Sequence, residues 1–169
     1  MNILKVLLPA AGLLLSACAA TGPSYSDVQS KIPVVAADKG RVYFYRNGEF
    51  VGKGVQPDIK LNGETVGESK PGGFFYVDRD PGQYEVSTST ETTNKIVFKL
   101  DKGQERYIRT SVSMGVFVGH VRPELVYPDQ GISDLSQCKY TGADADELAA
   151  RASNSTGSGP TPGSPALAR

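Results

Sequence analysis

Short apolar-rich runs separated by turn residues fill the middle of the chain, from residue 39 to residue 142. The runs are rich in Val, Ile, Tyr, Phe and Thr, and Gly, Pro, Asn and Asp interrupt them every few residues. This pattern is typical of β-strands. About seven or eight such strands, with no long helical period between them, predict an all-β domain that folds as an antiparallel β-sandwich. A small closed barrel is the alternative.

Three turn signals predict how neighbouring strands are joined. Asn62-Gly63 lies between two short extended runs, and both residues tolerate positive φ, which predicts a two-residue hairpin. The segment 80–82 is Asp-Pro-Gly, and the segment 102–103 is Lys-Gly. We expect a hairpin at each, because Pro presets one φ angle and Gly tolerates the positive φ of a tight turn.

A different pattern opens the chain. One charged residue, Lys5, precedes about 12 uncharged residues that end at Ala17. A transmembrane helix needs roughly 20 apolar residues, so the run predicts a secretory signal peptide over residues 1–17. The alternative is a buried helix, which Pro9 and Gly12 disfavour.

The end of this run resembles the lipobox of bacterial lipoproteins, which is an aliphatic residue, two small residues and a cysteine. Here these are Leu15, Ser16, Ala17 and Cys18. The resemblance implies cleavage after Ala17 and lipid attachment to Cys18. Each buried methylene contributes about 0.8 kcal/mol to membrane binding, and two or more acyl chains give a stable anchor. Ala19 in place of aspartate implies, by the enterobacterial sorting rule, the outer membrane, with the protein facing the periplasm.

The flanks of the central domain differ from it in composition. Residues 18–38 are small, polar and irregular, and we expect them to form a lipidated tether. Residues 143–169 are expected to form a short helix near 144–152, followed by a disordered tail rich in Gly, Ser and Pro.

Charge and composition exclude some partners. Of 18 basic side chains, cleavage removes only Lys5, so the mature chain carries 17 basic against 18 acidic side chains. Such a balance gives no bias toward nucleic acid, and we expect no nucleic-acid partner. No second apolar run is long enough to span a bilayer, so we expect the membrane contact to run through Cys18.

The sequence offers little catalytic chemistry. His120 is the only histidine, and no G-x-S-x-G context accompanies it, so we expect no catalytic residue and no enzyme. His120 and Cys138 do not make a zinc set, and Asp78 with Asp80 lacks the further ligands of a calcium loop. We therefore expect no metal and no cofactor. Cys138 is expected to be a buried apolar side chain, with a reactive thiol as the alternative.

Five aromatic residues form the candidate binding surface: Tyr43, Tyr45, Phe74, Phe75 and Tyr76. Alternation along a strand directs some of them outward, where they could stack on sugar rings or anchor a protein partner. The alternative is that each covers a face of the sheet. Exposed sheet edges are the other candidate surface, because an edge can accept an added strand.

Several segments occur in the order seen in a known family: GRVYFYR, IKLNGETVGE, GGFFYVDRDPGQYEVS, LDKGQERYIR and LSQC. Over residues 38–141 the chain resembles the bacterial lipoproteins called domain of unknown function 2846. The PGQYEV piece is also similar to PEGA-type and other transthyretin-like sandwich modules. The resemblance implies a lipoprotein with a β-sandwich and carries over no catalytic residue. We therefore predict a lipid-anchored envelope lipoprotein that acts as a structural or protein-binding module, with a glycan- or peptidoglycan-binding module as the alternative.

Overall fold

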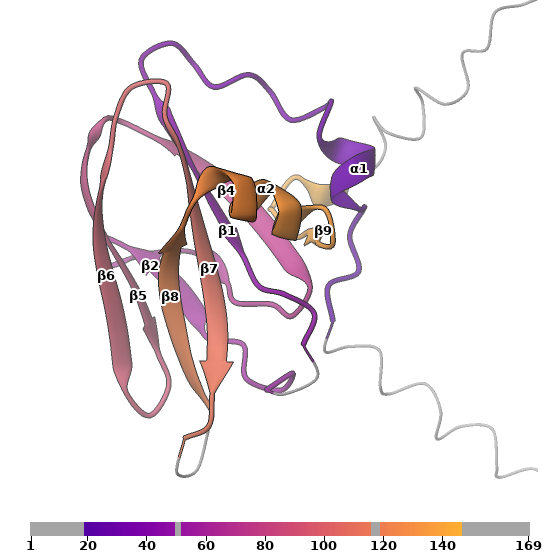
Figure 1. The fold of residues 1–169 in the computed structure, drawn as a ribbon, viewed down its shortest axis with the longest axis vertical. Coiled ribbons are helices and arrows are strands. Elements are labelled where there is room, and N and C mark those ends of the chain that lie inside the picture. The colour runs from indigo at the N-terminus through magenta and orange to yellow at the C-terminus, as the bar shows by residue number, and fades with distance from the viewer. Residues whose placement is uncertain (1–18, 50–51, 116–118, 147–169) are drawn as a thin grey trace, which may run out of the picture.

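The computed structural model describes residues 19–49, 52–115 and 119–146, and these residues build two β-sheets packed face to face (Figure 1). The five-stranded sheet has the order β8 (His120–Val126), β7 (Glu105–Ser113), β1 (Gly40–Tyr45), β4 (Gly73–Arg79), β9 (Lys139–Tyr140). The four-stranded sheet has the order β3 (Glu64–Glu68), β2 (Asp58–Leu61), β5 (Gly82–Ser89), β6 (Thr93–Leu100). The all-β sandwich expected from the sequence is confirmed. Two strand pairs, β1–β7 and β4–β9, are nevertheless parallel.

One of the three expected hairpins is confirmed. β2 and β3 pair antiparallel across Asn62 and Gly63, whose φ angles are 50° and 86°. The other two expectations are wrong. The turn at 80–81 joins β4 to β5, the turn at 101–104 joins β6 to β7, and in each case the two strands lie in different sheets. Turn residues specify a local reversal of the chain, and they do not specify which sheet the next strand joins.

The core between the sheets follows the alternation of β1. Val42 and Phe44 face the four-stranded sheet and are fully buried. The ring of Phe44 stacks on Phe75 of β4 at a centroid distance of 5.1 Å. The opposite sheet contributes these buried apolar residues: Ile59, Leu61, Val86, Phe98 and Leu100.

The other face of β1 is buried as well, because two helices cover it. α1 (Tyr25–Val28) places Tyr25 edge-on to Phe74, with ring centroids 5.4 Å apart. α2 (Pro128–Leu135) places Asp134 where the hydroxyl of Tyr45 donates to its carboxylate at 2.7 Å. α2 begins at a proline, which suits the first turn of a helix because no intrahelical donor is lost there.

From residue 19 onward, the segment expected to form a tether packs on the domain. The N–H of Ala20 donates to the carbonyl oxygen of Pro71 at 3.1 Å, and the N–H of Tyr25 donates to that of Cys138 at 3.0 Å. The Arg41 side chain donates to the carbonyl oxygen of Pro33 at 2.8 Å. The composition of residues 19–38 predicts the lack of long helices or strands, but it does not predict that hydrogen bonds hold the segment on the domain.

The two ends of the chain lie largely outside the described residues. The expected signal peptide over 1–17, the lipid attachment residue Cys18 and the expected tail all fall outside the described part. Of the helix expected near 144–152, residues 145–146 are helical and residues 147–152 lie outside the described part.

Candidate functional site

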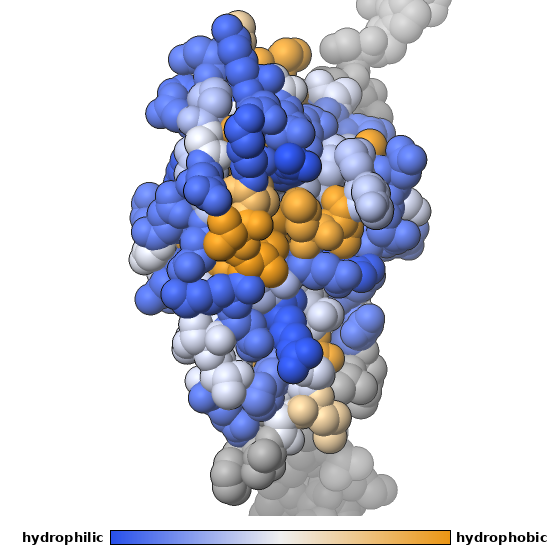
Figure 2. All heavy atoms as spheres, turned by 60° about the vertical axis from the view of Figure 1, so that its left-hand side comes forward, coloured by the Kyte–Doolittle hydropathy of each residue, from blue (hydrophilic) through white to orange (hydrophobic). Residues whose placement is uncertain are grey.

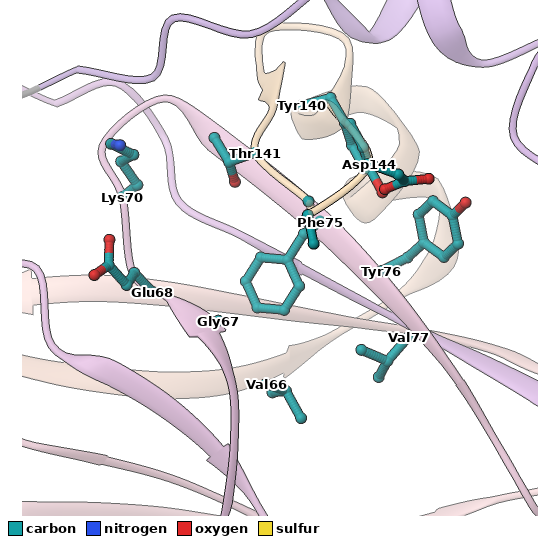
Figure 3. Close-up of a pocket in the computed structure, with 12 residues that line it drawn as sticks. Val66, Gly67, Glu68, Lys70, Phe75, Tyr76, Val77, Tyr140, Thr141 and Asp144 are labelled. Carbon is teal, nitrogen blue, oxygen red and sulfur yellow. The ribbon is translucent and has the colours of Figure 1, made fainter. Parts of the chain in front are cut away.

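The two sides of the sandwich differ in how their sheet edges meet. On the β6–β8 side, Thr88 and Asn94 of the four-stranded sheet donate to the carbonyl oxygen of Val121 in β8, at 2.7 and 3.1 Å. On the opposite side, β3 and β4 are separated by a groove of about 460 Å³, lined also by residues 140–144 (Figure 3). This groove is the candidate functional site.

The edge of β4 that borders the groove is only partly paired. β9 pairs with β4 at Gly73 and Phe74, and the Phe74 carbonyl oxygen also accepts from the N–H of Thr141 at 2.7 Å. Because main-chain groups alternate in direction along a strand, Tyr76 and Asp78 direct theirs to the same side as Phe74. Within the described residues no strand pairs with β4 on this side beyond Phe74. Among the residues that the structure describes, this stretch of β4 is therefore an open strand edge.

The opposite wall is β3, the edge strand of the other sheet. The pairing of β2 with β3 runs from Ile59–Gly67 to Lys60–Thr65, which leaves Val66 as the extra residue of a β-bulge. Bulges re-aim side chains at sheet edges. Val66 consequently lines the groove together with Val77 of β4 (Figure 3).

Phe75 forms the floor of the groove and lies against Gly67. A Cβ on residue 67 would come within 2.5 Å of the Phe75 ring, so glycine is the residue that lets the two strands approach this closely. Phe75 is only 5% exposed. The floor is thus apolar and firmly packed.

Charged and polar side chains mark the ends of the groove. Just beyond Val77 and Val66 along the two strands, the Arg79 guanidinium of β4 lies 3.7 Å from the Glu64 carboxylate of β3. Lys70 and Thr141 line the other end of the groove. Along the wall, Tyr140 donates to Asp144 at 2.6 Å. Burial, together with this hydrogen bond, raises the pKa of Tyr140. An apolar floor beside open main-chain groups is suited to holding an extended polypeptide.

The structure does not assemble the expected aromatic surface. Tyr43, Tyr45, Phe74 and Phe75 are each at most 5% exposed, because the second sheet, the helices and the N-terminal segment cover them. Tyr76 is half-buried, and the Arg41 guanidinium lies 4.3 Å from its ring centroid. These residues therefore form no exposed stacking platform, and of the five only Phe75 and Tyr76 line the groove.

Arg41 is a buried charge that the sequence did not single out. It is 2% exposed and makes two hydrogen bonds to the Asp78 carboxylate, at 2.6 and 2.8 Å. Their positions opposite each other in the β1–β4 register could have suggested the pair, had the pairing of the strands been known. The pair fixes the end of β4 against β1.

His120 has partners that lie far away in the sequence. Its Nδ1 lies 2.8 Å from the hydroxyl of Thr92, and its Nε2 lies 3.2 Å from the carboxylate of Glu91. Both partners belong to the turn between β5 and β6, so the contacts tie this turn to the start of β8. A separation of 28 residues hid the arrangement from sequence reasoning.

Two further expectations concern the Cys138 thiol and a metal site. Cys138 is buried, as favoured from the sequence, and burial raises its pKa to about 12. Among residues 19–49, 52–115 and 119–146, no three His, Cys, Asp or Glu side chains gather as metal ligands. The described helices include none with the length and apolar character needed to cross a bilayer.

A second surface feature is an apolar patch on the β6–β8 side. Figure 2 shows apolar side chains gathered at mid-height of this side, surrounded by hydrophilic ones. The exposed apolar residues of these two strands are Val97, 58% exposed, and Leu125, 41% exposed. Hydrogen bonds join the two sheets on this side, whereas a groove separates β3 from β4 on the other. The groove between β3 and β4 therefore remains the candidate site.

Fold and groove together define a two-sheet β-sandwich with one open side. The chain belongs to the family of proteins of unknown function called DUF2846, whose profile matches residues 36–121. It is also similar to a protein of Haemophilus influenzae described as uncharacterized. The two are 35% identical over 130 residues, which cover 74% of this chain and 76% of that protein.

Proposed function

We propose that the protein is a lipid-anchored lipoprotein of the outer membrane whose sandwich binds another envelope protein in the periplasm without catalysing a reaction. The anchor is supported by the short apolar run that ends in Leu15, Ser16, Ala17 and Cys18. The binding role is supported by the groove between β3 and β4.

One observation carries the binding role: the open edge of β4 beside an apolar floor. Main-chain donors and acceptors on such an edge are satisfied when an extended segment pairs with them as an added strand. The open stretch from Tyr76 to Arg79 spans about 13 Å, enough for a strand of about four residues. The side chains of that strand would alternate between the apolar floor and solvent.

Photocrosslinking in intact cells tests the binding role. A benzophenone amino acid at Val66 in the groove is expected to give a discrete adduct with a second protein. The matched control carries it at Val97, which is exposed in the same sheet but lies on β6. Equal adducts from both positions, or an adduct only with this chain's own C-terminal residues, would contradict the proposal.

The lipid anchor is tested separately by the intact mass of protein purified from membranes. We expect a chain that starts at Cys18 and carries a diacylglyceryl thioether, with or without an N-acyl chain. A membrane-purified chain that retains residues 1–17 or carries no lipid would contradict the anchor.

The glycan-binding alternative has no observation in its favour. Stacking on sugar rings needs exposed aromatic faces. Four of the five candidate rings are at most 5% exposed, and the fifth, Tyr76, is half-buried. We therefore do not propose it as a second function.

A further inference from the structure

The first described residues are held against one end of the sandwich. Ala20 is 6% exposed, and its N–H donates to the carbonyl oxygen of Pro71, in the turn that precedes β4. A Cβ on Gly73 would lie 3.3 Å from the Ala20 Cβ, 3.0 Å from the Thr141 side chain and 3.1 Å from the Lys70 carbonyl oxygen. Ala20 therefore lies beside the residues that form one end of the groove.

The next few residues hold this position. A Cβ on Gly22 would come within 2 Å of the Tyr140 carbonyl oxygen, so the chain passes in close contact there. The N–H of Tyr140 donates to the carbonyl oxygen of Pro23 at 2.8 Å, and Ser24 bridges to Lys139. Residues 20–24 could serve as a longer link to the membrane only if these contacts were broken. The segment is thus part of the fold and does not act as a spacer.

The end of the sandwich beside Ala20 is rigid as well. The Arg46 side chain is 3% exposed and donates to three main-chain carbonyl oxygens, those of Gly52, Val55 and Ser69, at 2.8, 2.6 and 3.2 Å. Gly48 and Gly72 lie in contact at the same end. The surface formed by the turns at 46–49 and 70–72 is therefore a fixed feature, which we call the anchor-side end.

Chain geometry limits how far this end can stand from an acylated Cys18. Only Ala19 separates Cys18 from Ala20, and consecutive Cα atoms are about 3.8 Å apart, so the reach is at most about 7.6 Å. The polar layer of a bilayer is about 5–7 Å thick on each side of the hydrocarbon core. With its acyl chains in that core, Cys18 cannot hold the anchor-side end far above the headgroups.

We infer that the domain rests directly on the bilayer, with its anchor-side end against the headgroups and the Lys70 end of its groove opening at the membrane surface. This inference rests on the proposed lipid anchor. The partner that fits such a groove is an extended segment of another membrane-anchored envelope protein, one that lies close to its own point of attachment. A segment far from the bilayer would have to reach down to it.

Collisional quenching in vesicles tests this orientation. The lipidated protein is labelled with bimane at Gly48→Cys, on the anchor-side end, or at Lys102→Cys, at the far end of β1. A Cβ on residue 48 meets nothing closer than 3.9 Å, and Lys102 is exposed. The far end is marked by Gly103, which donates to the Lys39 carbonyl oxygen just before β1 begins. Spin labels on the lipid headgroups are expected to quench bimane at residue 48 several-fold more than at residue 102.

A control lengthens the link. A flexible Gly-Ser insertion of ten residues between Ala19 and Ala20, with a mean span of about 17 Å, is expected to reduce the difference between the two positions. Equal quenching of the two positions without the insertion would overturn the inference, as would stronger quenching at residue 102. Intact mass shows separately whether lipid is attached, so loss of the anchor and loss of the orientation are distinguishable.

Discussion

Single residues decide the shape of the groove, and Gly67 is the clearest case. Its Cβ position lies 2.5–2.9 Å from three ring atoms of Phe75. Gly67→Ala is therefore expected to displace the ring and to lower the free energy of unfolding by about 1–3 kcal/mol, as overpacking does. Gly54→Ala is the matched control, because a Cβ there meets nothing within 4 Å. Urea denaturation of both variants measures the effect, and equal stability of the two would contradict it.

Cys138 shows how burial controls reactivity at one residue. Burial, with a smaller contribution from the Asp134 charge, raises the pKa of the Cys138 thiol to about 12. Because the thiolate is the reactive form, we expect the folded Cys18→Ser protein to resist maleimide at pH 8 and the denatured protein to react fully. The comparison of labelling with and without denaturant measures this. Rapid labelling of the folded chain would show that the thiol is accessible.

At the scale of elements, the covered face of β1 and its neighbours makes the fold sensitive to alkali. Burial raises the pKa of Tyr43 to about 12, and burial with hydrogen bonds to Asp134 and Glu105 raises the pKa of Tyr45 and Tyr107. An unfolded phenol loses its proton near pH 10. Above that pH the unfolded state binds fewer protons than the folded state, so stability falls as pH rises.

Denaturant midpoints should therefore stay level from pH 7 to about 9.5 and fall from about pH 10 to 12. Absorbance at 295 nm, which reports tyrosinate, should rise together with the loss of β-structure. A spectroscopic titration that completes near pH 10 with the fold intact would contradict the burial of these side chains.

The N-terminal segment is an element of the fold, although its composition indicates a tether. Val28 is fully buried, and Tyr25 packs on Phe74. A chain that starts at residue 39 is expected to lose about 2–5 kcal/mol of stability relative to one that starts at residue 19, since it exposes these contacts. Thermal unfolding followed by circular dichroism measures the difference. Equal melting temperatures would show that the segment contributes nothing.

These elements also show which features of the fold could be predicted from the sequence. Strand positions and the Asn62-Gly63 hairpin follow from local chemistry, namely alternation and the freedom of two residues to take positive φ. The sheet to which β5 and β7 belong does not follow, because it depends on which buried faces meet. The burial of both faces of β1 could not be predicted from the sequence pattern either, because the helices that cover the strand pack on it through contacts between residues distant in sequence.

For the candidate site, the sequence identified sheet edges as a partner surface but not which edge. The open stretch of β4 exists because β9 is only two residues long, and the groove depends on the bulge at Val66 and on Gly67. None of these features has a strong local signature. Phe75 and Tyr76 were named as candidates for exposed stacking, and they reach the groove in another role, as its floor and wall.

At the scale of the whole molecule, the proposed lipid anchor at Cys18 and the folded domain are separable. The described contacts with the sandwich begin after Cys18, at Ala20, so Cys18→Ser is expected to leave the melting temperature unchanged while it releases the protein from the membrane. The partner would then no longer share a surface with the groove. A shared membrane raises the effective concentration of two binding segments, toward the millimolar range for short links.

We therefore expect Cys18→Ser to reduce the adduct formed through Val66 by about tenfold or more, although the groove itself is unchanged. The matched comparison is the same variant supplied with a different lipid anchor before residue 19, which should restore the adduct. An undiminished yield from the soluble variant would mean that the partner is itself a soluble periplasmic protein. The binding role of the groove would then stand, while membrane proximity would not be what brings the two proteins together.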